Sequence, residues 1–139
     1  MDAAALKVAI VDDNRDIVAS LGKLVTLAGF QVVAKVTEAA AAFDYIVDEQ
    51  PHVVLLDLSM PFVDGYALAR RIRQNILPAP KLVAVTGFGQ QNDKTQAMDA
   101  GFDAYFVKPV DWSRLEELLT SYTHLHHPDP RAVRCRAWT

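Results

Sequence analysis

The run Val53-Val54-Leu55-Leu56-Asp57 places four apolar residues directly before one carboxylate. Consecutive apolar residues of this kind are typical of a strand that is buried on both faces, as in a parallel sheet. A charged group at the end of such a strand is costly to desolvate unless it meets water, a metal ion or a partner. Asp57 is therefore either a cap of the following turn or a reactive group, and the rest of the chain has to distinguish the two.

Apolar, strand-like runs alternate with helical patterns along the whole chain. The predicted strands are 6–11, 31–35, 52–56, 82–85 and 104–107, and the predicted helices are 14–28, 38–49, 66–75, 90–100 and one that follows a cap at 111. Strict alternation indicates an α/β fold with a doubly wound, five-stranded parallel sheet, (βα)5, and helices on both faces. We expect one domain over residues 1–124 and a flexible C-terminal tail over 125–139.

The composition excludes several classes of protein. A formal net charge of −3 argues against broad electrostatic binding to nucleic acid. No apolar run approaches the ~20 residues that a membrane-spanning helix needs, and Asp2 stands where a signal peptide would carry positive charge. The single cysteine, Cys135, suits a reducing compartment. We expect a cytoplasmic protein that does not insert into membranes.

Polar residues gather where the predicted strands end. Asp12 and Asp13 follow the first strand, Asp57 the third, Thr86 the fourth and Lys108 the fifth. Because ligands bind outside the carboxyl ends of the strands in such sheets, we expect these side chains to meet. Clustered carboxylates raise a pKa or bind a cation, and oxygen donors alone favour Mg²⁺. A carboxylate beside such an ion and a lysine can act as a nucleophile towards phosphorus.

These residues resemble the motifs of the receiver domain of two-component response regulators. The motifs are Asp12-Asp13, the frame Leu55-Leu56-Asp57-x-x-Met60-Pro61-x-x-Asp64-Gly65, Thr86-Gly87 and Tyr105-x-x-Lys108-Pro109. The similarity covers residues 6 to about 122 and implies the flavodoxin-like strand order 2-1-3-4-5. The stretches 12–16, 85–90 and 101–111 are most similar to receivers attached to hybrid histidine kinases.

The resemblance also implies a role for each motif residue. Asp57 would be the phosphoacceptor, and Thr86 and Lys108 would bind the phosphoryl group. The implied Mg²⁺ ligands are Asp13, Asp57, the backbone carbonyl of Ser59 and, through water, Asp12. Tyr105 would be an aromatic switch that turns inward when Thr86 moves towards the phosphate. The alternative for Tyr105 is a core aromatic whose hydroxyl lies at the surface.

The implied function is a phosphorylation-activated signalling switch. A sensor histidine kinase or a histidine phosphotransfer protein would donate to Asp57, and the face made by the fourth helix, fifth strand and fifth helix would change for an output protein or a second copy of the chain. Such a protein catalyses only its own phosphorylation and dephosphorylation. It could act alone, or it could be the receiver of a hybrid histidine kinase in a phosphorelay.

Two other classes fit the residues less well. A haloacid-dehalogenase-like phosphatase would have a second aspartate two residues after its nucleophile, where this chain has Ser59, and a cap insertion that this chain lacks. A flavodoxin-like cofactor binder would have a Ser/Thr/Gly-rich loop after the first strand, where Asp12-Asp13 have the opposite charge pattern.

Two polar segments have ordinary structural interpretations. Arg71 and Arg73 are expected on a solvated face of the helix 66–75. The helix 90–100 has little beyond Ala97 and Met98 to bury. It is therefore predicted to be weakly anchored, either as a solvated face or as part of an output surface.

Overall fold

The computed structural model describes residues 5–60, 64–87, 91–126 and 137–138. Its elements are β1 (Lys7–Val11), α1 (Arg15–Leu27), β2 (Gln31–Val36), the short 3₁₀ helix η1 (Ala39–Ala41), α2 (Ala42–Glu49), β3 (Val53–Asp57), α3 (Gly65–Asn75), β4 (Lys81–Thr86), α4 (Gln91–Ala100), β5 (Ala104–Val107), α5 (Trp112–His126) and β6 (Ala137–Trp138). The ends predicted for the five strands and the first four helices agree with the structure to within one residue, except that the predicted helix start at 90 lies outside the described residues. The last helix begins directly after the predicted cap at 111. The predicted helix 38–49 is divided between η1 and α2.

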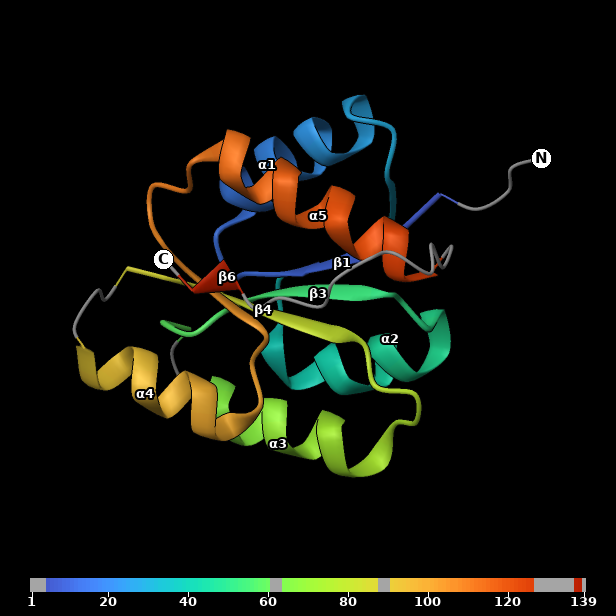
Figure 1. The fold of residues 1–139 in the computed structure, drawn as a ribbon. Coiled ribbons are helices and arrows are strands. Elements are labelled where there is room, and N and C mark those ends of the chain that lie inside the picture. Colours follow the sequence, from blue (N-terminus) through green and yellow to red (C-terminus); the bar gives the residue numbers. More distant parts are fainter. Residues whose placement is uncertain (1–4, 61–63, 88–90, 127–136, 139) are drawn as a thin grey trace.

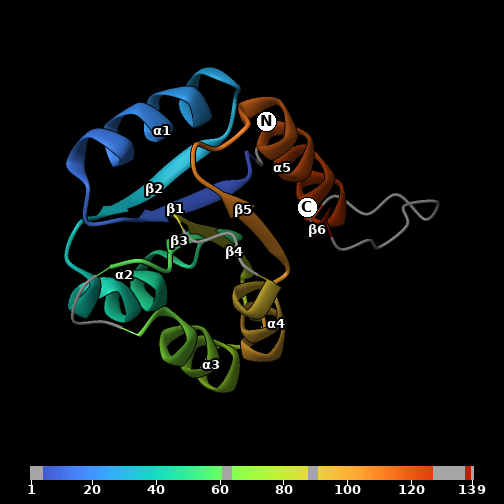
Figure 2. The same cartoon turned by 90° about the vertical axis from the view of Figure 1, so that its left-hand side faces the viewer.

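The strands form one parallel sheet between two layers of helices (Figures 1 and 2). Its strand order is β2-β1-β3-β4-β5-β6, with parallel pairing throughout. Helices α1 and α5 cover one face, and α2, α3 and α4 cover the other. The predicted doubly wound α/β fold and the order 2-1-3-4-5 are confirmed for the first five strands.

The C-terminal segment differs from the prediction. Helix α5 ends at His126, and the expected domain boundary at 124 stays a prediction. The two residues of β6 pair with β5, so the sheet has a sixth strand that was not predicted. The rest of the expected flexible tail, 127–136 and 139, lies outside the described residues. None of the helices in the described part is both long and apolar enough to cross a membrane.

The run that ends at Asp57 lies in the middle of two hydrophobic cores. Val53 and Leu55 pack with residues of α1 and α5, whereas Val54 and Leu56 pack with residues of α2, α3 and α4. All four are at most 2% exposed. Because successive side chains of a strand point to opposite faces, a strand buried on both sides reads as a continuous apolar run. β3 is therefore held rigidly up to the carboxylate at its end.

Side-chain caps set the start of the helices that follow the functional strands. The side-chain oxygen of Asn14 accepts hydrogen bonds from the backbone N–H groups of Asp16 and Ile17, at 2.9 and 3.1 Å. Asp64 caps α3 in the same way. These caps satisfy N–H groups that the first turn of a helix leaves without partners. Each cap therefore fixes where the helix after a functional strand begins.

The predicted solvated face of α3 is confirmed for Arg71, which is exposed, but is wrong for Arg73, which is partly buried. Arg73 donates from Nε to the carbonyl oxygen of Gly101, at 2.8 Å, and forms an ion pair with Asp103. The guanidinium of Arg71 lies over the ring of Phe43, 3.8 Å from its centroid. Helical periodicity could not reveal these contacts, because the partners come from distant parts of the chain.

The prediction for α4 is wrong in one residue. Among the α4 residues whose burial is described, 94–100, Ala97 and Ala100 are buried, while Met98 is 46% exposed. Two alanines bury little apolar area, so the weak anchoring expected from the sequence agrees with the structure. The contacts that Arg73 makes with Gly101 and Asp103 instead hold the chain just after α4 against α3.

Replacing Asp103 by alanine is expected to lower the free energy of unfolding by about 2 kcal/mol. The carboxylate accepts from Arg73 and also from the backbone N–H of Leu82, at 2.9 Å, so its loss leaves two donors without their acceptor. Urea unfolding followed by circular dichroism measures this change. The matched control is Asp99→Ala on the exposed side of α4, which should change stability by less than about 0.5 kcal/mol. Equal losses in the two variants would contradict the structural role of Asp103.

Candidate functional site

The strand order brings the predicted polar residues to one edge of the sheet. β1, β3, β4 and β5 are neighbours, and they end beside Asp12, Asp57, Thr86 and Lys108 respectively. Carboxylate oxygens of Asp12, Asp13 and Asp57 all lie within 4.8 Å of one another. The structure thus assembles, from four separate strands, the group of residues that the sequence singled out.

Lys108 bridges two of the carboxylates. Its Nζ lies 3.0 Å from Oδ2 of Asp12 and 3.3 Å from Oδ2 of Asp57. The two carboxylates are almost completely buried, at 3% and 2% exposed. Burial alone lowers the pKa of Lys108, but the hydrogen bond to Asp12 and the charge of Asp57 outweigh it, so the pKa is raised above its ordinary value. The ammonium group is therefore fully protonated at neutral pH.

The two carboxylate oxygens of Asp57 contact different partners. Oδ1 accepts hydrogen bonds from the backbone N–H of Ser59, at 2.9 Å, and from its hydroxyl, at 2.6 Å. Oδ2 faces Lys108. The carboxylate is therefore fixed in rotation. The contact with the Ser59 hydroxyl was not predicted, although a serine two residues from an aspartate can fold back in this way.

Asp12 and Asp13 differ in exposure although they are adjacent. Asp12 is buried, and burial raises its pKa above the ordinary value despite a hydrogen bond from the backbone N–H of Asn14 to Oδ1 and the contact with Lys108. Asp13 is exposed. One carboxylate of the cluster thus faces solvent while Asp12 and Asp57 lie inside. Three oxygen donors at this spacing, one of them open to water, fit a divalent cation that prefers oxygen ligands.

Thr86 and Tyr105 are buried residues of β4 and β5. The carbonyl oxygen of Thr86 accepts a hydrogen bond from the backbone N–H of Lys108, at 2.8 Å, which ties the end of β4 to the end of β5. Thr86 is 1% exposed and Tyr105 is 0% exposed. The alternative in which the Tyr105 hydroxyl lies at the surface is wrong. Tyr105 thus points inward, and its role as a switch stays a prediction.

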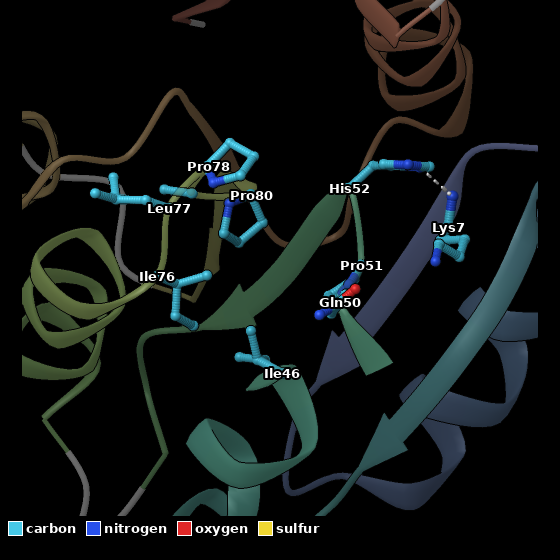
Figure 3. Close-up of a pocket in the computed structure, with 10 residues that line it drawn as sticks. Lys7, Ile46, Gln50, Pro51, His52, Ile76, Leu77, Pro78 and Pro80 are labelled. Atoms are coloured by element: carbon cyan, nitrogen blue, oxygen red, sulfur yellow. Dashed lines mark hydrogen bonds between the residues drawn. The ribbon is translucent and has the colours of Figure 1, made fainter. Parts of the chain in front are cut away.

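A hollow of about 380 Å³ lies away from this site, beside the amino-terminal ends of β1, β3 and β4. Figure 3 shows its lining, which includes Ile46, Leu77 and Pro78. Nδ1 of His52 accepts from the backbone N–H of Lys7 there, at 2.9 Å. The hollow contains none of the acidic residues and takes no part in the candidate site.

Comparison with known proteins identifies the residues around this site as a recognised unit. The response regulator receiver domain family matches residues 8–120. The chain is 29% identical over 122 residues to hybrid signal transduction histidine kinase L of Dictyostelium discoideum. The matched stretch covers 84% of this chain and 7% of that protein. It is 32% identical over 103 residues to the transcriptional regulatory protein PrrA of Mycobacterium tuberculosis. This match covers 74% of this chain and 43% of that protein. The chain thus spans less than half the length of these relatives.

Solved structures share the fold. The receiver domain of Ssk1 from Saccharomyces cerevisiae, in complex with the histidine phosphotransfer protein Ypd1, has a TM-score of 0.79 at 23% identity, covering 88% of this chain and 91% of that one. A CheY-like receiver domain protein from Methanospirillum hungatei has a TM-score of 0.74 at 25% identity, covering 86% and 97%. The five-stranded core of this chain is therefore the fold of those receiver domains.

The raised pKa of Lys108 predicts an alkaline limit of stability. Since the pKa is higher in the folded than in the unfolded state, protonated Lys108 stabilises the fold below about pH 10.5, and this contribution is lost as the pH rises through the folded-state pKa. The wild type should therefore melt at a higher temperature than Lys108→Met at about pH 9, and the difference should shrink towards about pH 12. Thermal unfolding at a series of pH values measures it. A difference that does not depend on pH would contradict the assigned charge interaction.

Proposed function

The chain belongs to the response regulator receiver domain family, and we propose that it is a signalling switch in which Asp57 accepts a phosphoryl group from a phosphohistidine. The observation that carries this proposal is the contact of Oδ2 of Asp57 with the Lys108 ammonium at an edge where two more carboxylates gather. A turn cap would need neither the lysine nor the acidic neighbours. The chain is a receiver domain of two-component signalling, and the transfer step is the part that we propose.

The proposed reaction uses Oδ2 as the nucleophile. Oδ1 already accepts two hydrogen bonds from Ser59, whereas Oδ2 faces the ammonium group. A bond forms between Oδ2 and phosphorus while the phosphorus–nitrogen bond of the phosphohistidine breaks, and its electron pair returns to the imidazole ring. Lys108 remains protonated and neutralises charge on the phosphoryl oxygens. The Thr86 hydroxyl would bind another of these oxygens.

The acidic cluster supports Mg²⁺ as the cofactor. We propose that Asp13, Asp57 and the backbone carbonyl of Ser59 bind the ion directly and that Asp12 acts through water. Bound Mg²⁺ would supply positive charge beside the phosphoryl oxygens. Asp12 and Lys108 hold each other in place at 3.0 Å, so they keep the buried side of the cluster ordered.

β5 would connect the phosphoryl-binding residues to the surface that contacts an output protein. The backbone hydrogen bond between Lys108 and Thr86 joins both phosphoryl-binding residues to that strand. A shift of either residue towards a phosphoryl group would move β5, and with it Tyr105 and the weakly anchored α4, which share one hydrophobic core. We propose that the α4–β5–α5 face carries this change to an output protein or to a second copy of the chain.

The donor that we propose is a sensor histidine kinase or a histidine phosphotransfer protein. A solved receiver of this fold is in complex with a phosphotransfer protein, and one relative is a hybrid histidine kinase. Since the chain spans only part of its relatives, it could act alone or as the receiver of a hybrid kinase in a phosphorelay. We propose that it catalyses only its own phosphorylation and dephosphorylation, in the cytoplasm, where a lone cysteine stays reduced.

Incubation of the protein with Mg²⁺ and a small acyl-phosphate donor tests the reaction directly. Intact mass spectrometry is expected to find one added phosphoryl group on the wild type and none on Asp57→Asn, because an amide cannot act as the nucleophile. The matched control, Asp99→Asn on the exposed side of α4, should react like the wild type. An adduct that persists in Asp57→Asn, or none on the wild type, would refute the assignment of Asp57.

The hydrogen bond from the Ser59 hydroxyl leads to a prediction about rate. In Ser59→Ala one of the two donors to Oδ1 is lost, while the backbone N–H and the backbone carbonyl remain. The carboxylate becomes a stronger nucleophile, so phosphorylation by the acyl-phosphate donor should be faster by about tenfold. Ser113→Ala, at an exposed position on α5, is the control and should keep the wild-type rate. An unchanged or slower rate in Ser59→Ala would contradict the proposed restraint.

A further inference from the structure

Strand β5 would be an exposed edge of the sheet if the chain ended after α5. Its sequence, Ala-Tyr-Phe-Val over residues 104–107, is apolar throughout. A bare edge of this kind presents unpaired N–H and C=O groups and is a template for pairing with another chain. Folded proteins generally protect such edges.

The structure places β6 along this edge. Ala137 lies opposite Ala104 and Trp138 lies opposite Tyr105, in parallel. Figures 1 and 2 show the short red strand there, close to the C-terminus. Because α5 leads the chain back along the sheet, β5, α5 and β6 form a crossover unit of the same kind as the preceding ones. β6 therefore lies at the edge where the ordinary topology of the fold places the next strand.

The register shows which backbone groups the tail covers. The carbonyl oxygen of Val85 accepts from the N–H of Leu58 on the β3 side, whereas that of Thr86 accepts from Lys108 on the β5 side. Peptide groups alternate in direction along a strand, so Ala84 also turns towards β5. Since Ala84 lies opposite Tyr105, the N–H of Tyr105 points to the outer edge, towards β6.

We infer that β6 is an intramolecular occupant of the β5 edge, which any other extended chain must displace before it can pair there. The partner that this surface fits is an extended peptide segment added parallel to β5, and the chain supplies one itself. Two paired residues make few hydrogen bonds, so β6 is held weakly enough for another strand to displace it. The exposed side chains of Met98 and Val107, on α4 and β5, offer apolar contacts to a competing segment.

This contact goes beyond the proposed phosphoryl transfer and does not depend on it. With β6 in place, β5 of the α4–β5–α5 face is already paired on both sides, by β4 and by β6. A protein or a second receiver that binds by strand addition would compete with the tail. One that binds through the helices alone would leave the tail in place. The tail thus selects the mode of binding at this face.

Amide hydrogen exchange of Tyr105, followed by NMR, tests the inference on the full chain. In the wild type the Tyr105 amide should exchange more slowly than the outward-facing amides of β2, which ends the sheet on the other side. Ala137→Pro removes the N–H of one of the two paired residues and should speed Tyr105 exchange by about tenfold. Ala137→Val keeps this N–H and should leave the rate within about twofold of the wild type.

Three results would overturn the inference. The first is wild-type exchange of Tyr105 as fast as at the β2 edge, and the second is no change in Ala137→Pro while Leu55 in β3 remains protected. The third is protection of Tyr105 that increases with protein concentration, because the strand would then come from a second copy. Phosphorylation of Asp57 is a separate measurement. A chain that fails to form the acyl phosphate can still show β6 paired with β5, and a chain without this pairing can still form the acyl phosphate.

Discussion

The structure depends on one charge balance, in which a single ammonium group lies between two buried carboxylates. Asp12 and Asp57 are nearly inaccessible to solvent, and Lys108 is 3.0 and 3.3 Å from them. A buried carboxylate without a partner is strongly unfavourable. The three residues lie at the carboxyl ends of β1, β3 and β5, so the balance exists only when these strands lie in the observed order and register. The chemistry of the site and the topology of the sheet therefore require each other.

Rigidity and mobility are divided across the molecule in a way that suits a switch. β3 is buried on both faces and carries Asp57 at a fixed place in the sheet. On the other side, the described part of α4 buries two alanines, and Arg73 contacts the chain that follows it. β5 is covered by a strand of two residues. A reacting group gains from a fixed position, whereas an output surface has to change at low cost. The two needs are met by different strands of one sheet.

Most of the fold could be predicted because the signals are local. The alternation of apolar strands with helical periodicity gave element ends within one residue, and the caps Asn14 and Asp64 lie where the pattern changes. The predictions failed where a partner is distant in sequence. Arg73 binds Gly101 and Asp103, and β6 pairs with β5 after a crossover, and no periodicity within α3 or the tail records those contacts.

The sequence by itself determined which chemical groups stand at the strand ends, because the order of residues alone places Asp57 and Lys108 directly after apolar runs. Parallel strands then bring those ends to one edge. Only the tertiary structure decided how the groups are paired: Lys108 with two carboxylates, the Ser59 hydroxyl with Oδ1 of Asp57, and Tyr105 inside the core. The physical reason is that periodicity fixes the face on which a side chain lies. Its distance from a side chain on another strand is set by packing and register, and hydrogen bonds and ion pairs depend on that distance.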